Sequence, residues 1–148
     1  MPAVPNSVDD DVQRALAEDV GSGDLSAAAI GADRTAQARV VAREAAVVCG
    51  RPWFDAVFAA IEPGIAIDWQ VDEGTRVEPA ATLCRLSGPA AALCTAERTA
   101  LNFLQLLSGV ATATRACVDA VAGTGVAILD TRKTLPGLRA AQKYAVAC

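Results

Sequence analysis

The 148-residue chain contains no histidine, and its only two lysines, Lys133 and Lys143, lie near its C-terminal end. Without histidine, these residues hold neither a His-based general acid or base nor a His-ligated metal ion. No apolar run approaches the roughly 18 residues of a membrane span, so we expect no transmembrane helix. The acidic balance, with 13 basic and 17 acidic side chains, argues against a broad nucleic-acid-binding face. It leaves room for a small basic pocket, because net charge describes the whole surface.

The cysteines form no CxxC pair, and their number is odd (Cys49, Cys84, Cys94, Cys117 and Cys148). Residues 9–11 are all aspartate, where a secretory signal would need basic and then apolar residues. This pattern is typical of a reducing compartment. We therefore expect reduced thiols in a cytoplasmic protein.

The first ninety residues show short helical and strand patterns in turn. Val12, Leu16 and Val20 share one helical face, and the segment 36–42 alternates as a half-buried strand does. The patterns predict helices over residues 10–20 and 52–61, and strands over 36–42, 46–49, 65–71 and 81–88. This half is therefore expected to be α+β, an antiparallel sheet with helices on it.

A different pattern follows. Residues 90–121 read as one long helix, with a potential interruption at Ser108-Gly109. Residues 126–129 are apolar on both faces, which is typical of a buried parallel strand, and a further helix is expected over 137–146. Helix, strand, loop and helix in this order begin an α/β barrel or a doubly wound sheet. We place a domain boundary near residue 110.

The long helix carries a narrow polar strip on a mostly apolar surface. At 100° per residue, the polar strip consists of Arg98, Asn102, Gln105, Gly109 and Thr112. Such a strip is often only the solvent-exposed face of a helix. Because most of this helix is apolar and suited to burial, Arg98 is also placed to lie at a cleft or an interface, where its planar fork suits a carboxylate.

Basic residues gather after the predicted strand 126–130. Four of the 13 basic residues lie between Arg132 and Lys143. In barrels and open α/β sheets, ligands bind at the C-terminal ends of the strands. The adjacent side chains of Arg132 and Lys133 cannot both lie flat on a sheet, so at least one can point into the ligand-binding end of the barrel or sheet. The alternative is a solvated loop with ordinary surface charges.

Three segments together resemble the quinolinate phosphoribosyltransferase family. They are "EDVGSGDLS" at 18–26, "ERTALNFLQLLSGVAT" at 97–112 and "LDTRKTLPGLRAAQKYAV" at 129–146. The resemblance implies an N-terminal α/β sandwich with a long linking helix (1–110), followed by the first strand and helix of an incomplete α/β barrel (111–148). It also implies phosphoribosyl transfer from phosphoribosyl pyrophosphate to quinolinate with decarboxylation. The products are nicotinate mononucleotide, carbon dioxide and pyrophosphate, in NAD biosynthesis.

The resemblance also implies site residues and partners. Thr131, Arg132 and Lys133 match residues that bind quinolinate and the phosphoribosyl donor, and Arg98 matches a residue that reaches across a homodimer to the substrate. Mg²⁺ is implied as a cofactor, with ligands outside this chain. Because family members are about twice as long, we expect the chain to be inactive by itself.

Two other interpretations stay open. The first is a paralogous pyrophosphorylase-like protein acting on another base. The second is a non-catalytic module that only dimerises. A carrier-type interpretation of the hairpin 71–88 is weak, because no lysine precedes Lys133 for such a carrier to modify.

Overall fold

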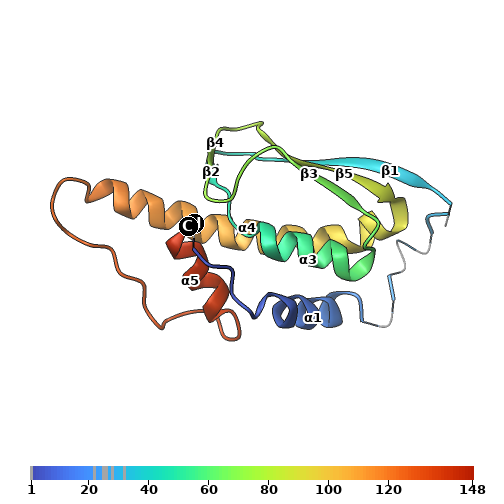
Figure 1. The fold of residues 1–148 in the computed structure, drawn as a ribbon, viewed down its shortest axis with the longest axis horizontal. Coiled ribbons are helices and arrows are strands. Elements are labelled where there is room, and N and C mark those ends of the chain that lie inside the picture. Colours follow the sequence, from blue (N-terminus) through green and yellow to red (C-terminus); the bar gives the residue numbers. More distant parts are fainter. Residues whose placement is uncertain (1, 22, 25–26, 28, 32) are drawn as a thin grey trace.

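The computed structural model describes residues 2–21, 23–24, 27, 29–31 and 33–148. Ser22, Leu25 and Ser26, which belong to the motif at 18–26, lie outside the described residues. The elements are α1 (Val8–Asp19), β1 (Thr35–Val41), β2 (Ala46–Val47), α3 (Arg51–Ile61), β3 (Ala66–Trp69), β4 (Arg76–Val77), β5 (Thr82–Pro89), α4 (Ala90–Ala120) and α5 (Arg139–Ala147). The sheet forms one layer, α3 and α4 the next, and α1 and α5 lie beyond them (Figure 1).

The main sheet has three antiparallel strands in the order β1-β5-β3. Leu86 in the central strand pairs with Ala38 on one side and with Ile67 on the other. Leu83, Cys84 and Leu86 are buried against the helices, while β1 is mostly exposed. The four strands predicted in the first ninety residues are confirmed as β1, β2, β3 and β5. The two-residue β4, which pairs with β2, is too short to produce an alternating pattern and was not predicted.

Aromatic side chains of α3 link the layers. Phe54 packs edge-on against Trp69 of β3, with ring centroids 5.1 Å apart. Trp53 is fully buried, lies 5.3 Å from the ring of Tyr144 in α5, and donates a 3.1 Å hydrogen bond to Oδ2 of Asp11 in α1. Two adjacent residues of α3 therefore connect the sheet to both outer helices.

Gly50 permits the close approach of α3 and α4. Its φ of 113° is in the left-handed region, and an added Cβ would lie 3.2 Å from Cδ1 of Leu107 and 3.3 Å from the Cα of Leu104. The amides of Gly50 and Arg51 donate hydrogen bonds of 2.6 and 3.1 Å to the carboxylate of Glu73. Glu73 thereby caps the N-terminus of α3 from the turn after β3.

Helix α4 runs without a break for 31 residues, so the interruption considered at Ser108-Gly109 is not formed. Ser108 accepts a 2.9 Å hydrogen bond from the amide of Cys49 and donates one of 3.1 Å to its carbonyl. Thr112 accepts a 2.8 Å hydrogen bond from the amide of Val47. These hydroxyls satisfy backbone groups in and directly after β2, so they join α4 to the β2–β4 pair instead of breaking the helix.

Residues 121–138, hereafter the 121–138 loop, leave the far end of α4 and return to α5 (Figure 1). The strand predicted over 126–130 is not formed: this stretch has no ladder partner in the described residues, and Leu129 is 82% exposed. A strand needs a neighbour to satisfy its backbone groups, and an apolar sequence alone does not supply one.

The helix predicted after the 121–138 loop is present as α5, which packs on α4. The predicted mixture of helices and antiparallel strands is confirmed, and the described residues contain no closed barrel. Across the described ranges, no helix combines the length and the apolar character needed to cross a bilayer.

Candidate functional site

Arg98 lies on the first third of α4, with its side chain 60% exposed. Its Nε donates a 2.5 Å hydrogen bond to Oδ1 of Asp19, the last residue of α1. The second carboxylate oxygen of Asp19 accepts a 2.9 Å hydrogen bond from Oγ1 of Thr99, a buried residue. One carboxylate from α1 therefore holds two consecutive residues of α4.

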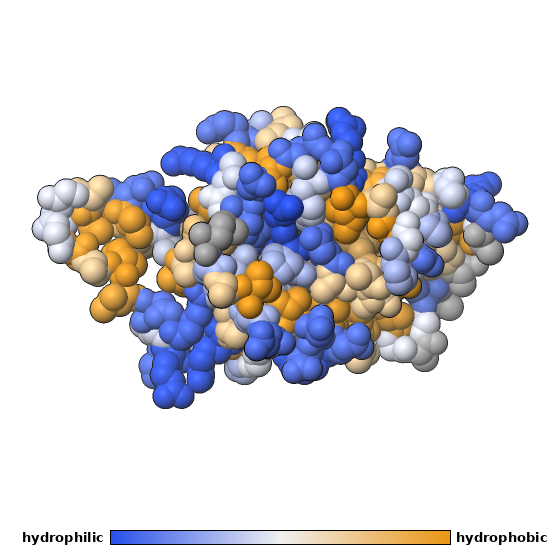
Figure 2. Space-filling view, viewed as in Figure 1, coloured by the Kyte–Doolittle hydropathy of each residue, from blue (hydrophilic) through white to orange (hydrophobic). Residues whose placement is uncertain are grey.

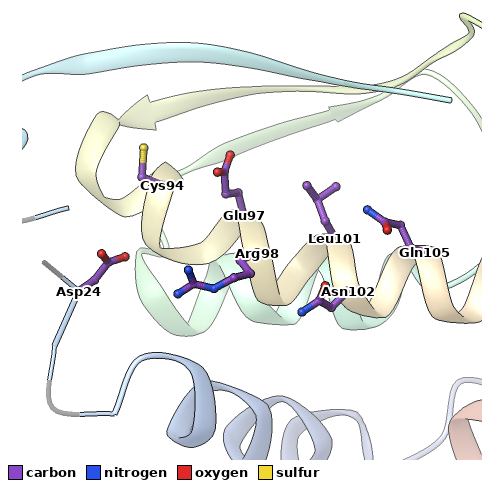
Figure 3. A pocket seen from close by; sticks show the side chains of 7 residues that line it. All are labelled: Asp24, Cys94, Glu97, Arg98, Leu101, Asn102 and Gln105. Atoms are coloured by element: carbon purple, nitrogen blue, oxygen red, sulfur yellow. The ribbon is translucent and has the colours of Figure 1, made fainter. Parts of the chain in front are cut away.

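A cavity of about 420 Å³ opens beside Arg98 (Figure 3). It is lined by one face of α4 and by the segment that follows α1: Asp24, Cys94, Glu97, Arg98, Leu101, Asn102 and Gln105. The first half of the polar strip is therefore one wall of the cavity. Thr112, in the second half of the strip, instead has a structural role, because it accepts the hydrogen bond from the amide of Val47 in β2.

Acidic side chains surround Arg98. The hydrogen bond that Arg98 donates to Asp19 raises the pKa of the Arg98 guanidinium above its ordinary value, and the nearby charges of Asp24 and Glu97 add to this effect. The cavity lining itself contains one basic residue, Arg98, and two acidic ones, Asp24 and Glu97. An anionic ligand would therefore need further cations from outside this wall.

Thr131, Arg132 and Lys133 are exposed on the 121–138 loop. The amide of Lys133 donates a 3.0 Å hydrogen bond to Oγ1 of Thr131, which closes a local turn. Within the part of the chain that the structure describes, neither Arg132 nor Lys133 is paired with a carboxylate. Their charges are therefore available to a ligand.

Helix α5 holds the 121–138 loop on both sides of these residues. Lys143 makes a 2.5 Å ion pair with Asp130, directly before Thr131. Gln142 accepts a 2.5 Å hydrogen bond from the amide of Leu135. The predicted basic cluster thus divides into two parts, with Lys143 bound to Asp130 and the pair Arg132–Lys133 facing solvent.

The structure does not bring Arg98 and the Arg132–Lys133 pair together. From Arg98 to Ala120, α4 continues for 22 residues, which is about 33 Å of helix. The 121–138 loop starts at that far end and turns back to α5 (Figure 1), and none of its residues lines the cavity beside Arg98. The predicted site residues therefore form two separate clusters within one chain.

The described residues include one group with the spacing of metal ligands, formed by Cys49, Glu73 and Cys148. Their ligand atoms lie within 4.8 Å of one another. Burial raises the pKa of both thiols and of the neighbouring Tyr144 hydroxyl, which keeps these groups protonated. Mg²⁺ prefers oxygen ligands, so this group does not fit the Mg²⁺ that the family resemblance implies.

Sequence reasoning did not identify Asp19 as a site residue. Its contact with Arg98 joins positions 79 residues apart, which no local periodicity reveals. The signal that could have identified it is the motif at 18–26, where Asp19 is the second residue.

Two family models match consecutive parts of the chain. Quinolinate phosphoribosyl transferase, N-terminal domain, matches residues 24–108, and quinolinate phosphoribosyl transferase, C-terminal domain, matches residues 110–148. A probable nicotinate-nucleotide pyrophosphorylase (carboxylating) from Synechocystis sp. is 40% identical over 138 residues, covering 93% of this chain and 47% of the relative. The nicotinate-nucleotide pyrophosphorylase (carboxylating) of Mycobacterium leprae is 41% identical over 144 residues, covering 93% and 50%.

The fold is shared with solved structures. The nicotinate-nucleotide pyrophosphorylase from Francisella tularensis matches with a TM-score of 0.94 at 39% identity, covering 99% of this chain and 52% of that one. The chain therefore spans about half the length of the curated relatives it matches. The two adjoining domain matches confirm the resemblance carried by the three motifs, and the chain belongs to the quinolinate phosphoribosyltransferase family.

Proposed function

We propose that the chain provides the N-terminal half of an enzyme that transfers the phosphoribosyl group of phosphoribosyl pyrophosphate to quinolinate. Decarboxylation then gives nicotinate mononucleotide, carbon dioxide and pyrophosphate, in NAD biosynthesis. The observation that carries the proposal is the unpaired Arg132–Lys133 pair, on a chain matched by both domains of this family.

The chemistry of the substrates suits these residues. Quinolinate has two carboxylates, and the donor has several phosphates, so the site needs cations to bind them. The fork of Arg132 can bind a carboxylate through two hydrogen bonds, and the ammonium of Lys133 can bind a phosphate as a point charge. The hydroxyl of Thr131 accepts the hydrogen bond that closes the turn at residues 131–133, and it can also donate to a ligand oxygen.

A homodimer would join the two clusters of site residues. The cavity beside Arg98 is acidic overall, and the Arg132–Lys133 pair lies on a loop that does not line it. In a twofold arrangement, Arg98 of one copy can meet the 121–138 loop of its partner, and the symmetry produces two such sites. Opposite charges on the two surfaces favour this pairing.

Catalysis would depend mainly on positioning and on fixed charge. Departure of pyrophosphate leaves an oxocarbenium-like ribose, and side chains held in place stabilise charge that develops there. Mg²⁺ would neutralise the leaving pyrophosphate. The described residues offer no oxygen-ligand cluster for it, so its ligands would come from the longer protein.

We also propose a cytoplasmic location for the protein. All five cysteines are unpaired, which suits a reducing compartment.

A chimera tests the proposed function. Residues 1–148 are joined to the part of the Synechocystis relative that follows its matched region, and both the chimera and the 148-residue chain are given quinolinate, phosphoribosyl pyrophosphate and Mg²⁺. We expect the chimera to form nicotinate mononucleotide and the shorter chain to form none. A chimera that uses a different base would favour the paralogous enzyme. Comparable turnover by the 148-residue chain would show that our placement of the site is wrong.

A further inference from the structure

Asp19 has a contact pattern that the proposed function does not yet use. Its two carboxylate oxygens bind consecutive residues of α4, Oδ1 the Nε of Arg98 and Oδ2 the hydroxyl of Thr99. Thr99 is 2% exposed, so this end of the contact is rigid. Arg98 is therefore tied to a fixed point of the fold through the carboxylate of Asp19.

The position of Asp19 is unfavourable for α1 itself. Asp19 ends α1, whose last turn holds no basic residue. A carboxylate at a helix C-terminus is opposed by the helix dipole. The tertiary contact with Arg98 and Thr99 offsets this effect. An aspartate at this position is therefore stabilised by its contacts with α4 and not by α1.

The contact fixes Arg98 in a particular way. Asp19 accepts a hydrogen bond from the Nε–H of the guanidinium, and the two terminal nitrogens of Arg98 are left to bind other partners. The side chain extends from α4 along the cavity, toward the segment that carries Asp24 (Figure 3). A long side chain held at Nε loses less conformational freedom when its terminal nitrogens bind a ligand.

We propose that Asp19, supported by Thr99, is a positioning residue that presents the terminal nitrogens of Arg98 to a substrate carboxylate. This inference rests on the proposed function, because it needs Arg98 to contact the substrate. Asp19 acts through Arg98 and does not touch the substrate. It gives the motif at 18–26 a physical role in the site.

The test uses the chimera with single substitutions. Asp19→Asn keeps the shape and an acceptor for Thr99 but removes the charge that orients Arg98. We expect the KM for quinolinate to rise about 10-fold or more, since small misplacements of a binding group cost up to about 10²-fold. The KM for phosphoribosyl pyrophosphate should change less. Glu18→Gln, which neutralises the exposed neighbouring carboxylate on α1, is the matched control and should change neither KM.

Spectroscopy on the 148-residue chain provides a readout that does not depend on activity. The Nε–H signal of Arg98 should exchange slowly with water in the unsubstituted chain and in Glu18→Gln. Asp19→Asn should make this exchange faster. If the signal exchanges equally fast in all three chains, Asp19 does not hold Arg98 and the proposal is wrong.

The outcomes separate this inference from the proposed function. If Arg98→Ala abolishes quinolinate use but Asp19→Asn lowers only the melting temperature, the Asp19 contact is merely structural and this inference fails. If Arg98→Ala itself leaves the kinetics unchanged, the role proposed for Arg98 fails first. If Asp19→Asn raises the KM for quinolinate while the melting temperature stays within a few degrees, the inference is upheld.

Discussion

Arg98 and the Arg132–Lys133 pair are cations assigned to one site, yet the chain holds them in opposite ways. Arg98 lies on a 31-residue helix and is bound by Asp19. Arg132 and Lys133 lie on an exposed loop and have no acidic partner in the described residues. The difference teaches that the fold itself orients Arg98, whereas it leaves the charges of Arg132 and Lys133 to a ligand or to another polypeptide segment.

The two regions also differ in what stabilises them. Helix α4 buries Leu93, Leu104 and Leu107 against the rest of the fold, whereas the 121–138 loop exposes Val126 and Leu129. Substitutions of buried side chains should therefore lower stability, whereas substitutions of the exposed cations should weaken ligand binding.

The largest expected effect is on stability, at Trp53. Trp53→Ala removes a fully buried side chain, its contact with Tyr144 and its hydrogen bond to Asp11. We expect a loss of about 3–5 kcal/mol in the free energy of unfolding, measured by urea denaturation of the 148-residue chain. Leu129→Ala, in the exposed loop, is the control and should change it by no more than about 0.5 kcal/mol. Equal losses would show that the 121–138 loop is packed.

The next effect is on binding, at Arg98. In the chimera, Arg98→Ala should weaken transition-state binding by about 2–5 kcal/mol, measured from kcat/KM for quinolinate. The melting temperature should barely move, because the side chain is 60% exposed. Unchanged turnover together with a large loss of stability would reassign Arg98 to a structural role.

The smallest effect is a pH dependence at Asp55. Burial raises the pKa of this carboxyl group, although the hydrogen bond from Trp69 and the charge of Arg51 lower it in part. Because the folded pKa lies above the unfolded one, the group favours folding at low pH, and this contribution is lost as pH rises through the folded pKa. Asp55→Asn should therefore raise the melting temperature slightly at pH 7, with a smaller gain at pH 4.

The control for Asp55 is Asp68→Asn, which changes an exposed carboxylate of β3. Because this side chain is exposed, its substitution removes no buried charge and should change the melting temperature little. If Asp55→Asn instead destabilises the chain equally at both pH values, the 2.8 Å hydrogen bond from Trp69 depends on the carboxylate and outweighs its burial.

Local sequence patterns predicted those elements that a short segment can specify by itself. The helices containing Leu16, Trp53 and Tyr144 have apolar faces that identify them, and the alternation in β1 and β5 identifies strands. The apolar stretch from Val126 failed as a strand prediction, because strand formation depends on neighbours that its own sequence does not encode.

The candidate site was predictable to a similar extent. The polar strip and the motifs led to Arg98, Thr131, Arg132 and Lys133, and their functional role stays a prediction. The separation of these residues into two clusters follows from where α5 holds the 121–138 loop, and the contact with Asp19 follows from tertiary packing of α1. Neither can be read from periodicity.

The central claim is that the site forms from two copies of the chain. The most direct measurement mixes a chimera carrying Arg98→Ala with one carrying both Arg132→Ala and Lys133→Ala, after dissociation and reassociation. Each parent should be nearly inactive. Random pairing makes half of the dimers mixed, and each mixed dimer has one complete site, so we expect about a quarter of the unsubstituted activity. If the mixture stays as inactive as its parents although mixed dimers form, Arg98 and the Arg132–Lys133 pair do not meet across an interface.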